Sequence, residues 1–175
     1  MLTWVRVTRE LPDYSRIVAL YERAFPANER RPLDPLLDDP TGCADFAAFY
    51  AKDEFVGFAC FLSWEDMTHI LYIAMDEEAR GCGYGTEALR LIHERYEGRR
   101  IMADLEAEAE GVANNDQRRK RRHFYLVNGY EPTEVSYRWR NEDYEILSQG
   151  GNVTAEDFKA FWHYFEEENT AFSAF

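Results

Sequence analysis

Residues 80–86 read Arg80-Gly81-Cys82-Gly83-Tyr84-Gly85-Thr86, and all seven are candidate ligand contacts. It follows the almost wholly apolar segment 69–75 and leads into segment 86–96, where apolar residues recur with the period of a helix. Three glycines at alternate positions let the backbone approach a ligand closely and turn its N–H groups inward. The positive end of the following helix favours an anion at the same place. The sequence therefore predicts a pyrophosphate-binding loop between a buried strand and a helix.

A dinucleotide-binding fold is the main rival for such a loop. Asp104 lies 21 residues after Gly83, near the position of a ribose-binding carboxylate in that fold. However, Thr86 stands where the pattern G-x-G-x-x-G needs its third glycine. The part of the chain after the loop predicts an antiparallel pair of strands and no further βαβ units. We therefore reject the dinucleotide fold, while a glycine turn without any ligand stays open for the loop taken alone.

Outward from the loop, periodicity and turn residues predict one mixed sheet with helices on its faces. The predicted strands are 3–8, 44–51, 54–64, 69–75, 100–108, 130–140 and 144–147. The predicted helices are 13–24, 86–96, 116–128 and a last one that Thr154 caps. The order is β-α-β-β-β-α-β-α-β-β-α, with no internal repeat or linker. We expect residues 1–175 to form a single domain.

Composition narrows the class of protein. A net charge of −13 argues against binding to nucleic acid or an anionic membrane, although the basic run 117–122 could by itself suggest a DNA-binding protein. The same charge favours cationic small molecules or basic peptides as partners. No apolar run reaches the roughly 20 residues that span a bilayer, and residues 1–6 lack the apolar core of a secretory signal, so we expect a cytoplasmic protein. The three cysteines and four histidines are scattered and predict no metal site.

Two motifs together resemble the acetyl-CoA signature of the GNAT superfamily of N-acetyltransferases. The loop matches R/Q-x-x-G-x-G/A through Arg80, Gly83 and Gly85, and the segment from Phe124-Tyr125 to Tyr130 resembles the element FY-x-x-x-G-F/Y. The predicted element order matches the superfamily over nearly the whole chain. The resemblance implies an α/β (α+β) fold, with a mixed, mostly antiparallel sheet of six or seven strands and about four helices. Segment 105–108 resembles a bacterial subgroup whose acceptors are mostly unassigned.

The resemblance also implies acetyl-CoA as co-substrate, an amine as acceptor and direct attack in a ternary complex. The pantetheine arm is expected to pair with the backbone of Ile73 and Met75. On the helix 116–128, we expect Phe124 to contact the coenzyme. We also expect a contact from at least one basic residue on the face that carries Tyr125, and Arg121 is our first choice. The acceptor is a small or peptidic amine, and the charge favours polycations.

Tyr125 matches the position that serves as general acid in many relatives. A phenol with a pKa near 10 can share its proton with a departing thiolate whose conjugate acid has a pKa near 8.5. An amine with a pKa near 10 is unprotonated in a fraction on the order of one in two thousand at pH 7. A base is therefore needed as well. The alternative for Tyr125 is a core tyrosine that packs the helix against the sheet.

The base is expected on the strand 100–108, because a two-residue period sets Asp104, Glu106 and Glu108 on one face. Mutual repulsion would raise at least one pKa, and the three would also hold a cationic substrate. Glu106 is our choice because it lies mid-row, with Asp104 and Glu108 as substrate-binding residues. The alternatives are a solvated face, a water chain, or residues 65, 66 and 69 near the start of the preceding strand.

Two further expectations concern the acceptor site and the end of the chain. Glu29 and Arg30, in the loop after the first helix, could hold an ammonium and a carboxylate, or be surface charge without a role. The apolar segment 171–175 is a candidate homodimer contact. A noncatalytic acyl-CoA sensor of the same fold is the alternative function, and release of thiol from acetyl-CoA would separate it from an enzyme.

Overall fold

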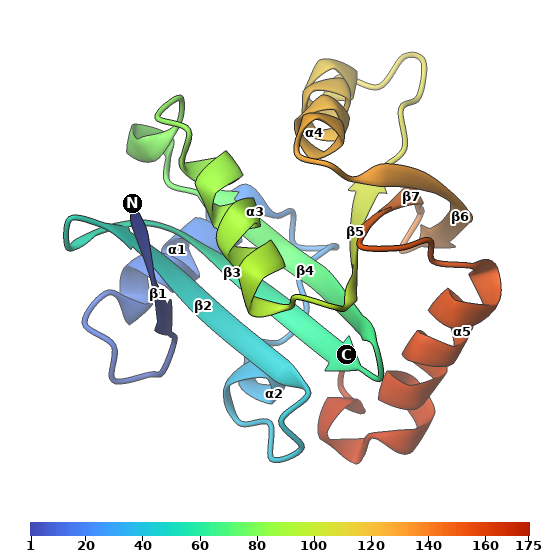
Figure 1. The fold of residues 1–175 in the computed structure, drawn as a ribbon, viewed down its shortest axis with the longest axis horizontal. Coiled ribbons are helices and arrows are strands. Elements are labelled where there is room, and N and C mark those ends of the chain that lie inside the picture. The colour runs from blue at the N-terminus through green and yellow to red at the C-terminus, as the bar shows by residue number, and fades with distance from the viewer.

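The computed structural model describes residues 1–175, which form one seven-stranded sheet and five helices (Figure 1). The strands are β1 (Leu2–Arg6), β2 (Ala44–Ala51), β3 (Glu54–Trp64), β4 (Met67–Met75), β5 (Arg100–Glu106), β6 (Glu131–Trp139) and β7 (Glu142–Gln149). The helices are α1 (Tyr14–Ala24), α2 (Asp34–Leu37), α3 (Tyr84–Arg95), α4 (Asn115–Val127) and α5 (Ala155–His163). The strand order is β1-β2-β3-β4-β5-β7-β6, and only the β4–β5 pair is parallel. No helix is long and apolar enough to cross a membrane.

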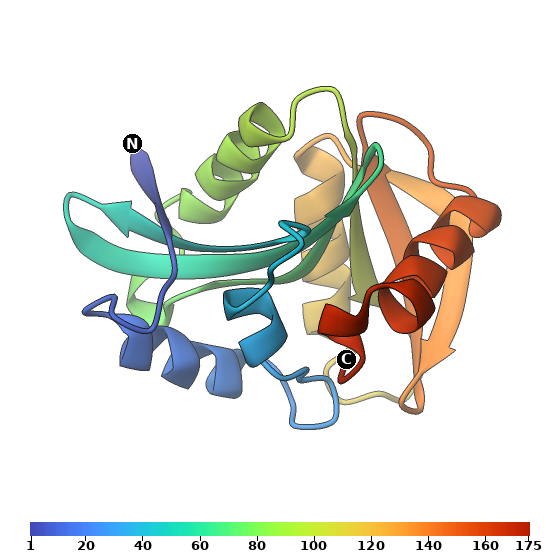
Figure 2. The ribbon, with the colours of Figure 1, turned by 90° about the horizontal axis from the view of Figure 1, so that it is seen from below.

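Both faces of the sheet are covered, so successive residues of the central strands are apolar. Along β2, Phe46 and Ala48 belong to the core under α1, α2 and α5, whereas Ala47 and Phe49 belong to the core under α3 and α4. Figure 2 shows α3 on one side of the sheet and α1 and α2 on the other. This two-sided burial explains why β2, β3 and β4 read as nearly continuous apolar runs.

The sheet opens between β4 and β5, and this opening positions the site. β4 pairs with β5 only from Met67 to Ile70, and β5 turns away beyond that point (Figure 1). On its other side β4 pairs with β3 up to Met75, with Leu71 as the extra residue of a bulge between Ile70 and Tyr72. Residues 71–75 therefore have no strand partner on the β5 side. Their backbone groups on that edge are available to a ligand.

Most of the predicted elements are confirmed, and the differences are local. β5 ends at Glu106, two residues earlier than expected, so Glu108 does not continue the row of carboxylates. The segment 27–40, expected as a loop with room for one helical turn, contains the four-residue helix α2, which is the fifth helix. At the end of the chain, Phe172 packs against Phe165 within the chain's own core. Phe172 thus contributes to the core of the chain, and a dimer contact at residues 171–175 stays a prediction.

Candidate active site

The loop before α3 has a row of free backbone donors. None of the six consecutive amides from Gly81 to Thr86 donates a hydrogen bond within the chain, whereas Arg80 and Glu87 on either side bond to Glu77 and Gly83. No side chain caps the N-terminus of α3. Six unpaired N–H groups at a helix N-terminus form a binding site for an anion of diphosphate size.

The glycines of this loop are required by its backbone. Gly81 and Gly83 both have φ of +79°, a conformation that side chains with a Cβ adopt at a cost of about 1–2 kcal/mol. Gly85 lies close to Phe124, because a Cβ there would be 3.2 Å from the ring and the ring would have to shift by a few tenths of an ångström. α3 and α4 can therefore approach each other closely at Gly85, and Phe124 forms part of the wall beside the free amides.

An open groove runs from the loop along the free edge of β4. Its lining includes Ile73, Met75, Arg80, Gly81, Gly83, Tyr84, Gly85, Thr86, Arg121 and Phe124. These are ten of the eleven residues that the sequence assigned to the coenzyme, and the structure brings them together. Arg23 and Lys120 add positive charge to the groove. Cys82, the eleventh, is exposed at the loop and its side chain is not part of the lining.

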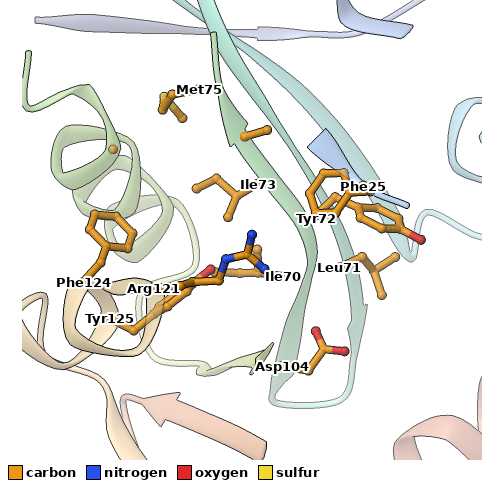
Figure 3. Close-up of a pocket in the computed structure, with 12 residues that line it drawn as sticks. Phe25, Ile70, Leu71, Tyr72, Ile73, Met75, Asp104, Arg121, Phe124 and Tyr125 are labelled. Carbon is orange, nitrogen blue, oxygen red and sulfur yellow. The ribbon is translucent and has the colours of Figure 1, made fainter. Parts of the chain in front are cut away.

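The groove leads into an inner cavity between α4 and β4. Figure 3 shows Phe124, Arg121 and Tyr125 on one side of this cavity, and Phe25 and Tyr72 on the other. Tyr125 is 4% exposed, its ring packs edge-on against Tyr130, and its hydroxyl has no hydrogen-bond partner within the chain. Burial raises the pKa of Tyr125, so the hydroxyl keeps its proton at neutral pH. A neutral, unpaired phenol facing a cavity can donate a proton or a hydrogen bond to a ligand there.

Asp104 lies where the inner cavity meets a second cavity. One carboxylate oxygen is 3.2 Å from Nε2 of the buried His69, and the other accepts a hydrogen bond from Tyr137 at 2.5 Å. Burial by itself would raise the pKa of Asp104, but His69 and Tyr137 together hold it below its ordinary value. Asp104 therefore stays ionised, at the place where the two cavities join.

The second cavity is acidic and is the candidate acceptor site. Glu29, Asp104 and Glu106 all contribute to its lining. Burial, together with the neighbouring Glu106 carboxylate, raises the pKa of Glu29 to about 8. Glu106 is also 3.6 Å from the guanidinium of the buried Arg118. One carboxyl group that titrates near neutral pH thus faces a cavity that joins the groove.

The chain segment that carries Glu29 is fixed by hydrogen bonds from three directions. Tyr72 donates to the carbonyl of Glu29 at 2.8 Å, and the amide of Arg31 donates to Tyr72 and to Tyr21, each at 2.9 Å. From the β6–β7 turn, Arg140 donates to the carbonyls of Asn28 and Arg30. These bonds hold the side chains of Glu29 and Arg31 in the acceptor cavity.

The structure separates several residues that the sequence grouped. Arg30 is absent from the linings of the groove and of both cavities, and its guanidinium lies 3.9 Å from Glu22. Its neighbour Arg31 lines the acceptor cavity instead, together with Arg121. Glu108 pairs with Arg119 outside the cavities.

The carboxylates of β5 do not repel one another in the way that the sequence predicted. Asp104 has His69 and Tyr137, and Glu106 has Arg118, so each strand carboxylate has its own partner. The repulsion that matters acts between Glu106 and Glu29, which lies on another segment of the chain.

The arginines of the basic run on α4 have different environments. Arg118 is buried and bonds to Asn114, Ala107 and Glu142, and Arg122 bonds to Glu145, so both fasten α4 to the sheet. Only Arg121 faces the groove and both cavities.

Several lining residues have no local signal in the sequence. They are Phe25, Arg31, Leu71, Tyr72, Trp139, Tyr144 and Trp162. They come from the end of α1 and the loop after it, and from β4, β6, β7 and α5. Only the packing of these parts around the opening of the sheet brings them together.

A groove of this form suits a long cosubstrate with a diphosphate at one end and a reactive group at the other, and it defines the class as an acyltransferase that uses coenzyme A. The profile of the Acetyltransferase (GNAT) family matches residues 14–130. The chain belongs to the GNAT family of acetyltransferases, and acetyl-CoA is its acetyl donor. The comparison with curated protein sequences found no match.

Solved structures with the same fold span nearly the whole chain. A GNAT-family protein from Bacteroides thetaiotaomicron has a TM-score of 0.77 and 21% identity, covering 95% of this chain and 97% of its own. An aminoglycoside 6'-N-acetyltransferase complexed with coenzyme A has a TM-score of 0.64 and 14% identity, with coverages of 84% and 96%. The ribosomal-protein-S18-alanine N-acetyltransferase from Escherichia coli has a TM-score of 0.63 and 15% identity, with coverages of 90% and 98%. At these identities the likeness establishes the fold.

Proposed function

We propose that this protein transfers an acetyl group from acetyl-CoA to the amine of a small acceptor bound in the acidic cavity. The observation that carries the proposal is the continuity of three features: the free amides of the loop, the free edge of β4, and the cavity in which Tyr125 and Asp104 meet. Acetyl-CoA, when bound, supplies the acetyl group and leaves as the free thiol. The chain's own residues must bind and orient it, deprotonate the amine and protonate the thiolate.

Tyr125 is the proposed general acid. It donates its proton to the sulfur as the carbon–sulfur bond breaks, and recovers a proton from solvent afterwards. Its position supports this role, because the buried hydroxyl lines the inner cavity beside β4 and no group of the chain competes for its proton. The raised pKa of Tyr125 keeps the proton in place until a thiolate develops next to it.

Glu29 and Glu106 are the proposed base, acting as a pair. The acceptor enters as an ammonium, and one of its protons passes to this pair before the freed nitrogen attacks the acetyl carbonyl carbon. The nitrogen releases a second proton to solvent as the carbon–sulfur bond breaks, which leaves a neutral amide. The pKa of Glu29, about 8, is much closer to the pKa near 10 of an ammonium than that of an ordinary carboxyl is, so proton transfer to Glu29 is far less unfavourable. Asp104, which stays ionised, holds the positive charge where the two cavities join.

The test is release of free thiol from acetyl-CoA across a panel of amines, with coenzyme affinity measured in parallel by calorimetry. Amine-dependent thiol release with matching acetylated product is the expected result. Coenzyme binding without turnover of any amine would favour the noncatalytic acyl-CoA sensor. Absence of coenzyme binding by folded protein would contradict the assignment of the groove.

A further inference from the structure

Arg31 is one of two arginines, with Arg121, that line the acceptor cavity beside its three acids. Its hydrogen bonds are all made by its backbone N–H and C=O, and its guanidinium forms neither a hydrogen bond nor an ion pair within the chain. The guanidinium carbon lies 4.5 Å from the ring centroid of Trp139, 4.6 Å from Trp162 and 5.2 Å from Phe175. Three aromatic rings thus surround a cation that has no counter-ion of its own.

Burying the guanidinium of Arg31 without a hydrogen-bond acceptor costs free energy, and a bound anion would supply that acceptor. Burial lowers the pKa of Arg31, which is the sign that the cation has lost water, although a guanidinium remains protonated. Aromatic faces stabilise such a cation, yet they accept none of its N–H bonds along the edge of the guanidinium. Asp104 attracts Arg31, but its two oxygens are already engaged by His69 and Tyr137. Arg31 therefore presents free, charged donors to whatever enters the cavity.

The surrounding charges select the kind of anion. Three acids and two arginines line this cavity, so it offers partners to both signs of charge. A carboxylate carries one charge, and its planar pair of oxygens matches the fork of a guanidinium. Asp104, which stays ionised, attracts an ammonium group. The cavity therefore favours a ligand that carries both charges.

We propose that Arg31 is the carboxylate-binding residue of the acceptor site and that the acceptor is a small amine bearing a carboxylate, in the chemical class of amino acids. The inference rests on the proposed N-acetyl transfer, in which the ammonium end of the same molecule lies against Glu29 and Glu106. It differs from the polycationic acceptor that the net charge of −13 favours. A polyamine entering this cavity would bring further positive charge against Arg31 and Arg121.

The experiment compares matched acceptors in the full-length protein loaded with acetyl-CoA. The twenty common α-amino acids are each assayed beside the corresponding α-amide, with spermidine as the polycationic probe, and thiol release gives kcat/KM. The variants are Arg31→Gln, Arg30→Gln and Arg138→Gln, the last removing an exposed arginine of β6 outside the cavities. Coenzyme affinity, measured by calorimetry, verifies that each variant is folded.

The wild type is expected to prefer the best amino acid over its amide by about 10- to 100-fold, the range of one hydrogen-bonded charge pair. Arg31→Gln should remove that preference by lowering kcat/KM for the acid alone, while Arg30→Gln and Arg138→Gln keep it. Equal rates for acids and amides, or a preference for spermidine, would overturn the carboxylate subsite and leave the N-acetyltransferase standing. Turnover of no amine at all, with coenzyme still bound, would overturn both. The comparison of acids with amides in the wild type decides the matter even if Arg31→Gln does not fold.

Discussion

Replacing Glu106 by Gln should move the pH dependence of acetyl transfer to lower pH. Glu29 has a pKa of about 8, raised from 4.5 by burial and by its contact with Glu106. Neutralising Glu106 removes the like charge but leaves the burial, so the pKa of Glu29 should fall by about 1–2 units and remain above its ordinary value. The base must be deprotonated to act, so kcat/KM rises with pH through this pKa. The rising limb should therefore shift downwards by the same amount.

The size of the shift can be read at a single pH. At pH 6 a group of pKa 8 is deprotonated in about 1% of molecules, and one of pKa 7 in about 10%, so the activity at pH 6 relative to the plateau should rise about tenfold. The assay is thiol release from acetyl-CoA between pH 5.5 and 9.5 with the best acceptor, for wild type, Glu106→Gln and Glu29→Gln. Glu134→Gln, on the exposed face of β6, is the matched control. A profile of Glu106→Gln that superimposes on the wild type would refute the coupling, and complete loss of the limb in Glu106→Gln would make Glu106 itself the base.

Three further results are expected. Tyr125→Phe should lower kcat by about 100-fold or more and leave the calorimetric affinity for coenzyme A unchanged, because the ring still fills its place; unchanged turnover would remove Tyr125 from the mechanism. Gly83 and the control Gly111 have φ of +79° and +78° with open space around each, so replacing either by Ala should cost a similar free energy of unfolding, about 1–2 kcal/mol. Only Gly83→Ala should also weaken coenzyme binding. Equal coenzyme affinities of the two variants would contradict the assignment of the phosphate loop. Because the pKa of Asp104 is lowered in the fold, its stabilisation is present above the ordinary aspartate pKa and disappears as the pH falls through the lowered value. Asp104→Asn, which disturbs the bond to His69, should cost about 1–3 kcal/mol in denaturant unfolding at pH 7 and less at pH 3, and a pH-independent cost would contradict this.

Local patterns in the sequence were enough for the secondary structure and the coenzyme loop. β2 and β3 have the predicted bounds because turn residues flank uninterrupted apolar runs. The phosphate loop was recognisable because its function depends on backbone amides and on glycines that permit them, and these are contiguous in the chain. Thr154 forms the predicted cap of α5, where both bonds of a capping box are present.

The acceptor site could not be derived in the same way. The sequence placed Glu106 and Glu29 separately and could not show that Glu106 helps to raise the pKa of Glu29. It chose Arg30 over Arg31, because which of two adjacent arginines faces a cavity depends on how Tyr21 and Tyr72 hold the backbone between them.

Periodicity and backbone geometry within a few residues were thus enough to predict the element order and the glycine loop with its free amides. The tertiary structure alone decided what surrounds the acetyl group and the acceptor. Charges and rings from α1's end, β4, β5, β6 and α5 meet only where β5 leaves β4, and the pKa of each group depends on neighbours that are distant in the chain.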